Sequence, residues 1–324
     1  NYKKNNIFFK KMKNKLIIRL SNEVGNQMFM YASAYAISKE LNRTLCVDNE
    51  TAFLSKKNVS KFGLDSFEIT SEIAPDTLKF KNLFGYIKRK SLINTESLRK
   101  KKMFYIEKKN KDKISKFSND YTNINFNNNL FLEGHFESEK YFKNYKDEII
   151  NEFKFKNINT LKKSPYFAEI SKENTVSFCI RQNRFTEGKG QNTSRNKEKS
   201  WKFTLEQINY INKAANYIKS KVSNPRFFLW SNDFANITKD KFHFNYKEVR
   251  LNEEAGVIDT RIQSLYLLTH CNHFIVTTST FNWWGAWLSR AKNKMILRPS
   301  DKFFSDFYLN NRDFWPSNWD TINE

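Results

Sequence analysis

The second half of the chain alternates between short apolar runs and segments of helical periodicity, and this alternation restricts the fold more than any other feature. Runs rich in β-branched and aromatic residues predict strands at 176–180, 226–230, 273–276 and 295–297. Helices are predicted between them at 204–221, 258–269 and 281–290, the first opened by the capping box Thr204-Leu205-Glu206-Gln207. Strands separated by helices pair in parallel, so we expect a doubly wound α/β sheet with ligands beyond the carboxyl ends of its strands.

Polar residues suited to binding a diphosphate directly follow three of these strands. They are Arg181 and Arg184 after the first strand, Ser231 and Asp233 after the second, and Thr278, Ser279 and Thr280 where the third leads into a helix. Arginine binds diphosphate oxygens through paired N–H groups, and the first N–H groups of a helix lack partners within it. A carboxylate can accept paired N–H donors from a guanine edge. Each residue alone is typical of a surface arginine, a turn or a helix cap, but together they predict a nucleotide-diphosphate site.

The first half predicts a second α/β unit. A strand at 15–20 is followed by a turn that contains Gly25, a helix at 28–41 and a strand at 45–48. A strand at 130–132 and a helix at 143–153 come later, after a long stretch in which the pattern places no element. The polar stretch 154–165 is the predicted linker.

A chain of 324 residues is long enough for two domains. We expect a disordered tail or extension at 1–11, an N-terminal domain at 12–160, a C-terminal nucleotide-binding domain at 166–300, and a last segment, 301–324, that packs back on the N-terminal domain.

The formal net charge of +22 would attract nucleic acid, an anionic membrane face or a phosphorylated substrate. Nucleic-acid binding is the less favoured alternative, because the aromatic residues follow core periodicity and no RNA- or DNA-binding motif is present. No apolar run is long enough to span a membrane. The odd number and wide spacing of the cysteines predict a cytoplasmic protein, and its basic surface suits peripheral contact with an anionic membrane. Cys46, Cys179 and Cys271 predict reduced core thiols, and the four histidines show no metal-ligand spacing.

Four segments resemble the motifs of a known family. Residues 21–32 are similar to its opening G-G-L-G-N-Q-M-F-Q-Y-A, residues 134–142 to its G-Y-F-Q-S-E-K-Y-F, and residues 278–288 to its N-S-T-F-S-W-W-G-A-W-L. Residues 179–184 stand where the family has H-x-R-R-G-D. On these segments the chain resembles glycosyltransferase family 11, the α-1,2-fucosyltransferases of bacterial surface glycans.

The last of these segments keeps only the first arginine of the family motif, Arg181, and has Arg184 in place of an acid. In related fucosyltransferases that first arginine contacts the donor diphosphate and supports departure of GDP, so the resemblance implies that Arg181 is catalytic. Arg184 or Lys189 would replace the missing second cation. A cation directed at a leaving diphosphate contributes ~3–4 kcal/mol, so Arg181→Ala should lower turnover by ~10²–10³.

The resemblance also implies a GT-B-type fold, in which two Rossmann-like α/β domains face a cleft, with the donor on the C-terminal domain and the acceptor mainly on the N-terminal one. It implies inverting transfer of fucose from GDP-fucose to a glycan hydroxyl, through an α-1,2 linkage to galactose, without a metal or other cofactor. Gly25, Asn26 and Gln27 would contact the donor, and Asn26, which would face the cleft, is also a candidate catalytic residue. There Asn26 would orient the acceptor or the phosphate, or else cap the helix start.

The sequence singles out no general base. Glu187, Glu253, Glu254 and Asp259 are carboxylates of the donor half, but no spacing distinguishes one of them. Asp48-Asn49-Glu50 is the one loose match to the D-x-D turn of metal-dependent transferases. The altered arginine motif raises a further alternative, a degenerate protein that binds a nucleotide sugar without turnover.

Overall fold

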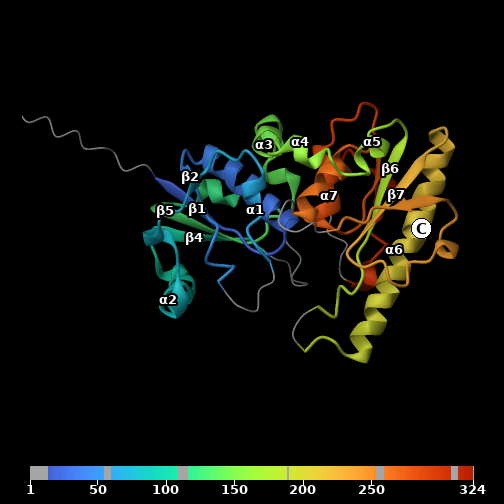
Figure 1. Ribbon diagram of the computed structural model, residues 1–324. Helices are drawn as coiled ribbons and strands as arrows, with labels where there is room; N and C mark the ends of the chain where they lie inside the picture. Colours follow the sequence, from blue (N-terminus) through green and yellow to red (C-terminus); the bar gives the residue numbers. More distant parts are fainter. Residues whose placement is uncertain are drawn as a thin grey trace, which may run out of the picture.

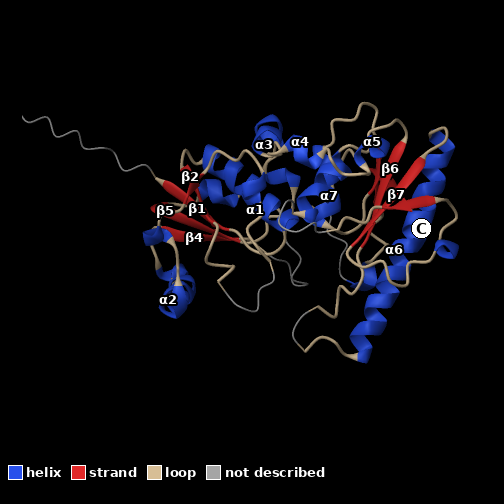
Figure 2. Ribbon diagram, viewed as in Figure 1, coloured by secondary structure: helices blue, strands red, loops and turns tan. Residues whose placement is uncertain are grey.

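The computed structural model describes residues 14–54, 60–108, 116–187, 190–252, 259–307 and 313–323, which form two α/β units with parallel sheets (Figures 1 and 2). This is the two-sheet α/β arrangement expected of a GT-B-type fold. The predicted tail at 1–11 lies outside the described residues.

The first sheet has the strand order β3-β2-β1-β5-β4. Its strands are β1 (Lys15–Arg19), β2 (Thr44–Asp48), β3 (Glu72–Ile73), β4 (Lys102–Ile106) and β5 (Phe126–Glu133). Its helices are α1 (Val24–Glu40), α2 (Asn82–Asn94) and α3 (Lys146–Glu152), and two short helices follow, α4 (Ile158–Leu161) and α5 (Phe167–Ile170). The central strand β1 pairs in parallel with β2 and β5, and its apolar residues are buried because both faces of the sheet are covered.

The second sheet has the strand order β11-β10-β9-β6-β7-β8. Its strands are β6 (Thr175–Ile180), β7 (Arg226–Ser231), β8 (Tyr246–Glu248), β9 (His273–Ile275), β10 (Ile296–Pro299) and β11 (Asp320–Ile322). Its helices are α6 (Ser194–Lys221), α7 (Thr260–Thr269) and α8 (Thr280–Leu288). The strand order reverses beside β6, the kind of position at which parallel sheets bind ligands.

Several predicted bounds differ from those in the structure. The helix α6 begins at Ser194 rather than at the capping box, because the Thr193 side chain accepts a hydrogen bond from the Asn196 N–H and caps the helix there. The Thr204 hydroxyl instead donates to the Ser200 carbonyl inside the helix. The predicted linker is also structured, since Phe155 forms a β-bridge with Phe67 and α4 follows.

The helix α1 lies between the two sheets (Figure 2), with thirteen of its seventeen residues buried. Burial on nearly every side explains why its sequence lacks a polar stripe. It begins at Val24, four residues before the predicted start, because the Gln27 N–H donates to the Glu23 carbonyl and closes an earlier first turn.

One aromatic core joins the two units. The ring of Phe29 on α1 lies 4.5 Å from Trp283 and 5.0 Å from Trp284 on α8, and Phe142 stacks on Trp284 at 5.6 Å. Phe314, in the last segment, contacts Phe29 at 5.9 Å. The same segment reaches the first unit through Asp313, which accepts from the Phe117 N–H and pairs with Lys140. The two sheets are therefore held together by shared side-chain packing.

Candidate active site

The loops at the carboxyl ends of the two sheets meet at Asn26. Its amide nitrogen donates to Glu137 Oε1 at 2.8 Å, in the loop after β5. Its amide oxygen accepts from the Thr280 hydroxyl at 3.2 Å, at the start of α8. One side chain thus links the ends of β1, β5 and β9, and Asn26 holds these loops together rather than simply capping α1.

Gly25 brings the N-terminus of α1 against the N-terminus of α8. A Cβ atom on Gly25 would lie 2.7 Å from Thr280 Oγ1 and 2.8 Å from the Phe281 backbone nitrogen, closer than side chains tolerate. The Trp284 indole N–H donates to the Gly25 carbonyl at 3.0 Å and fixes the approach. The positive ends of two helix dipoles therefore converge at this junction.

The hydroxyl cluster before α8 has mixed surroundings. The Thr277 hydroxyl is buried and donates to the Cys179 carbonyl at 3.2 Å. Thr278 Oγ1 is buried without a hydrogen-bond partner among the described residues. A buried polar atom of this kind is suited to a hydrogen bond with a bound ligand. Ser279 is the N-cap residue of α8, and its side chain makes no capping bond. Thr278 and Ser279 are therefore the hydroxyls left to receive an anion, whereas Thr280 is bound to Asn26.

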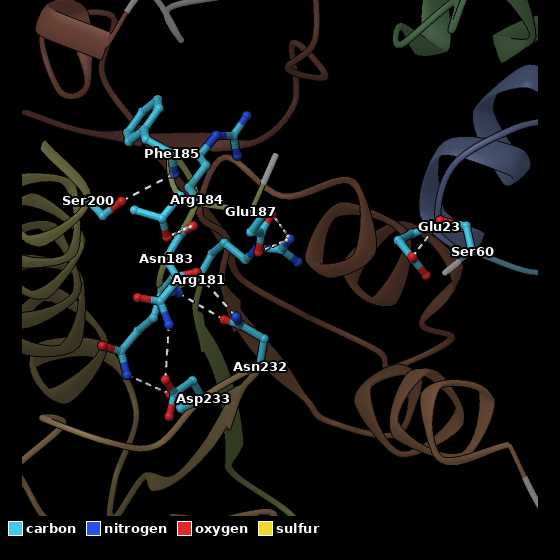
Figure 3. Close-up of polar contacts among 12 residues, drawn as sticks. Glu23, Ser60, Arg181, Asn183, Arg184, Phe185, Glu187, Ser200, Asn232 and Asp233 are labelled. Carbon is cyan, nitrogen blue, oxygen red and sulfur yellow. Dashed lines mark hydrogen bonds and ion pairs between the residues drawn. The ribbon is translucent and has the colours of Figure 1, made fainter. Parts of the chain in front are cut away.

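Arg184 and Arg181, both labelled in Figure 3, have different surroundings. Arg184 donates to the Thr278 carbonyl at 3.1 Å, and its guanidinium lies 5.6 Å from the centre of the Phe203 ring. Burial, and then the nearby Arg181, lower the pKa of Arg184. Arg181 is more exposed and donates to both oxygens of Glu187, at 2.6 and 2.7 Å. Arg184 thus provides a half-buried, partly desolvated cation beside Thr278, and Arg181 a cation already paired with a carboxylate.

The loops after β6 and β7 are tied together by side-chain amides. Gln207 on α6 accepts from the Arg181 N–H and donates to its carbonyl, both at 2.9 Å. Asn183 donates to Asp233 Oδ2 at 3.0 Å, as Figure 3 shows. The Ser231 hydroxyl donates to the Ile180 carbonyl at 2.9 Å. Ser231 and Asp233 therefore brace the loop that carries Arg181, and their predicted contacts with a nucleotide stay predictions.

Gln27 is fully buried and shapes the turn after β1. Its amide donates to the carbonyls of Asn22 and Lys61, each at 2.7 Å, and accepts from the Gly63 N–H at 3.0 Å. Every polar group of this side chain is engaged with backbone, so the structure gives Gln27 a part in holding the loop near residue 61. Its contact with a donor is untested.

Sequence reasoning missed Glu137 and His135. The Glu137 side chain lies in the junction, bound by Asn26 and 4.0 Å from His135 Nδ1, and its charge acts on Arg184. Between the two residues, the fully buried Phe136 has a φ of +52°, in the left-handed region that non-glycine residues rarely adopt. Such strain gathers at functional sites. The sequence feature that could have indicated these residues is a histidine and an acid on either side of an aromatic residue in the segment 134–142.

The other carboxylates considered from the sequence have defined partners or lie outside the described residues. Glu187 pairs with Arg181, and Asp259 caps α7 and pairs with Arg261. Glu253, Glu254 and Lys189 fall in ranges that the structure does not describe.

The Asp48-Asn49-Glu50 triplet is engaged in local contacts. The Asp48 carboxylate accepts from the Glu50 and Thr51 N–H groups, and Glu50 pairs with Lys79 and Lys81 at 3.1 and 2.9 Å. Within the described ranges, no three His, Cys, Asp or Glu side chains gather as a metal site. The three cysteines are free and buried, as predicted for core thiols.

The family model described as glycosyl transferase family 11 matches residues 2–323 of the chain. The chain belongs to glycosyl transferase family 11. It is therefore a glycosyltransferase, as the sequence motifs predicted.

This family 11 enzyme is similar to two curated Escherichia coli proteins along most of its length. It is 25% identical over 314 residues to an alpha-1,2-colitosyltransferase, covering 94% of this chain and 97% of that one. It is 26% identical over 307 residues to the O-antigen biosynthesis glycosyltransferase WbnK, covering 88% of this chain and 93% of that one.

Among solved structures, the enzyme is similar to fucosyltransferase NodZ from Bradyrhizobium, with a TM-score of 0.46, 14% identity, and coverage of 85% of this chain and 93% of that one.

No helix in the described part of the enzyme is both long and apolar enough to cross a bilayer.

Proposed function

We propose that this family 11 enzyme transfers fucose from GDP-fucose to a hydroxyl of a glycan acceptor, forming an α-1,2 linkage to galactose in the synthesis of a surface polysaccharide such as O-antigen. Family membership and the similarity to an O-antigen glycosyltransferase over most of its length support this reaction class. The transfer would invert the configuration of the sugar and would need no metal.

The observation that carries the proposal is the convergence of cations and unpartnered polar groups at the start of α8. Arg184 donates to the carbonyl of Thr278, whose hydroxyl is buried, and the N-termini of α1 and α8 meet nearby at Gly25 and Thr280. A diphosphate would satisfy all of these groups, because each favours negative charge. This diphosphate site at the start of α8 thus suits the GDP moiety of a donor.

In the proposed reaction, the acceptor oxygen attacks the anomeric carbon from the face opposite the diphosphate. The bond from that carbon to the diphosphate oxygen breaks, and GDP leaves with the bonding electrons. Glu137 takes the proton of the acceptor hydroxyl, and Asn26 orients the carboxylate through its 2.8 Å hydrogen bond. Arg184, and Arg181 once it leaves Glu187, stabilise the charge that develops on GDP.

Colitose is a second candidate for the transferred sugar. The similarity to an alpha-1,2-colitosyltransferase, which covers 97% of that protein, specifically favours it. The fucose and colitose donors would place their diphosphate in the same site, so they would differ only in the contacts to the sugar.

We further propose that the enzyme acts at the cytoplasmic face of a membrane, where glycan precursors are assembled, and touches that membrane peripherally. The net charge of +22 supports attraction to anionic lipid.

The proposal is tested by measuring GDP release from a panel of nucleotide sugars, with and without galactose-terminated acceptors. We expect acceptor-dependent release from GDP-fucose or the colitose donor, unchanged by a chelator, with a product of inverted anomeric configuration by NMR. Tight GDP binding without release under any acceptor would instead indicate a degenerate binding protein. Release that requires a divalent metal would refute the metal-independent mechanism.

A further inference from the structure

The helix α2 and the turn after it form an exposed apolar surface. No residue of α2 is buried, and Leu83, Phe84 and Ile87 are 68%, 82% and 55% exposed. Leu98, in the next turn, is 84% exposed. Figure 1 shows α2 projecting from the first unit, on the side away from the second unit. Four large apolar side chains thus extend into solvent on one projecting element, which is unusual for a solvated surface.

The exposed face of α2 is not the face with which it packs on its own unit. At 100° per residue, Arg89, Leu92 and Ile93 fall on one side of the helix, and Leu83, Phe84 and Ile87 on the other. Arg89 donates to Glu133, at 2.6 Å from its Nε, while Leu92 and Ile93 pack against the cluster that contains Ile17. The fold therefore anchors α2 by one side and leaves its more apolar side uncovered.

Basic residues surround this apolar face. Nine of the residues 79–102 are Lys or Arg, and one is acidic. Lys88, Lys90, Lys100 and Lys101 are exposed. Lys90 lies 5.5 Å from the centre of the half-exposed Tyr86 ring, beside the apolar face. The surface thus combines side chains that can leave water with charges that attract anions.

We propose that α2 and the turn at 96–101 dock on the anionic surface of a lipid bilayer, with Leu83, Phe84, Ile87 and Leu98 entering the boundary between headgroups and acyl chains. Amphipathic helices with aromatic and aliphatic residues on one face and lysines at its edge bind bilayers in this way. A second copy of the chain would bring like charge against like charge, and nucleic acid would leave the apolar residues in water. The bilayer satisfies both features, and the inference rests on the proposed peripheral membrane contact.

Co-sedimentation of the full chain with vesicles tests this surface without donor or acceptor. We expect binding to vesicles that contain phosphatidylglycerol, weakened by salt, and little binding to phosphatidylcholine alone. The double variants Leu83→Ser/Phe84→Ser and Lys88→Glu/Lys90→Glu should each lower the partition coefficient on the order of tenfold, since each lysine and each inserted side chain adds to binding. Melting temperatures should not change, because these residues lie outside the core.

Leu205→Ser/Tyr217→Ser is the matched control, since it removes two exposed apolar residues from α6 in the other unit. This variant should bind vesicles as the wild type does. Equal binding by the α2 variants, or equal binding to neutral vesicles, would overturn the proposal. Sedimentation that shows a dimer broken by Leu83→Ser/Phe84→Ser would assign the face to a second copy instead. GDP release with a soluble acceptor should be unaffected by the α2 variants, so the transferase reaction and the docking surface are tested separately.

Discussion

Arg181 and Arg184 lie three residues apart in one loop, yet they occupy different environments. Arg184 is half-buried and partly desolvated beside Thr278, and Arg181 is paired with Glu187 at the surface. A desolvated cation has lost its hydration before the ligand arrives, so it gains more from a diphosphate than a solvated one does. The two residues should therefore affect different steps.

We expect Arg184→Ala to weaken GDP binding by roughly 10- to 100-fold, as the loss of a hydrogen bond to a charged group does. Arg181→Ala should instead lower turnover by ~10²–10³ with a smaller effect on GDP affinity. Titration calorimetry with GDP and single-turnover kinetics measure the two effects. Arg184→Lys, which keeps the charge, should recover part of the affinity. Unchanged GDP binding by Arg184→Ala would refute the proposed diphosphate site at the start of α8.

Glu137→Gln keeps the shape of the side chain and can still accept the hydrogen bond from Asn26, but it cannot take a proton. We expect kcat to fall by roughly 10²–10⁴, with donor KM near the wild-type value. Glu23→Gln is the control, because Glu23 lies at the same junction but pairs with Arg261 at 2.9 Å. If Glu23→Gln stops turnover and Glu137→Gln does not, the base has been assigned to the wrong carboxylate.

The contact between α1 and α8 depends on a missing Cβ atom. Gly25→Ala would place a methyl group against the backbone of Phe281, so the helices must separate. We expect a loss of about 1–3 kcal/mol in the free energy of unfolding, together with weaker GDP binding. Gly63→Ala is the matched control, since its Cβ would meet Val24 Cγ2 at an ordinary 3.4 Å. Urea denaturation of both variants checks the prediction, and equal stabilities would contradict it.

A half-buried lysine in the turn after α8 lies against the other end of that helix. Lys294 donates to the carbonyls of Ala286 and Ser289, and burial lowers its pKa to about 8. A lysine in the unfolded chain has a pKa of about 10.4. Between this pKa and that of the folded protein, the unfolded chain therefore holds a proton that the folded chain has released. The contribution of Lys294 to the free energy of unfolding should therefore rise with pH across this window. Wild type and Lys294→Met, compared by urea denaturation from neutral to alkaline pH, should show this rise as a growing difference, and a constant difference would contradict it.

At the level of the elements, local signals predicted most of the strands and the start of α8. The cap at Ser279 and the apolar run of β9 lie next to each other in the sequence, so their pattern is visible without the fold. The early start of α6 at Ser194 was missed because its first turns are polar and carry no apolar stripe. The contact of Glu137 with Asn26 could not be predicted, because the two residues are 111 positions apart and such pairings are set only by the fold.

The largest of the buried apolar clusters spans both units of the molecule. A single cluster of buried side chains includes Ile18 from β1, Phe29 from α1, Trp284 from α8 and Trp319 from the last segment. Removing either unit would expose this aromatic surface to water, at about 25 cal/mol per Å².

We therefore predict that the full chain unfolds in one cooperative transition. Tryptophan fluorescence, dominated by the junction, and far-UV circular dichroism, which reports on both sheets, should give coincident urea curves. Two resolved transitions would show that the units are stable separately. The wild type needs no ligand for this test.

The bonds around Gly25 also restrict how a donor could enter and leave. Its contact with Phe281, the Trp284 indole bond and the shared aromatic rings join the two units, so we expect little hinge motion at this junction. If Arg181 contacts the donor as we propose, the exposed Arg181–Glu187 ion pair would have to open when the diphosphate binds. Donor binding would then be coupled to the release of Arg181 from Glu187.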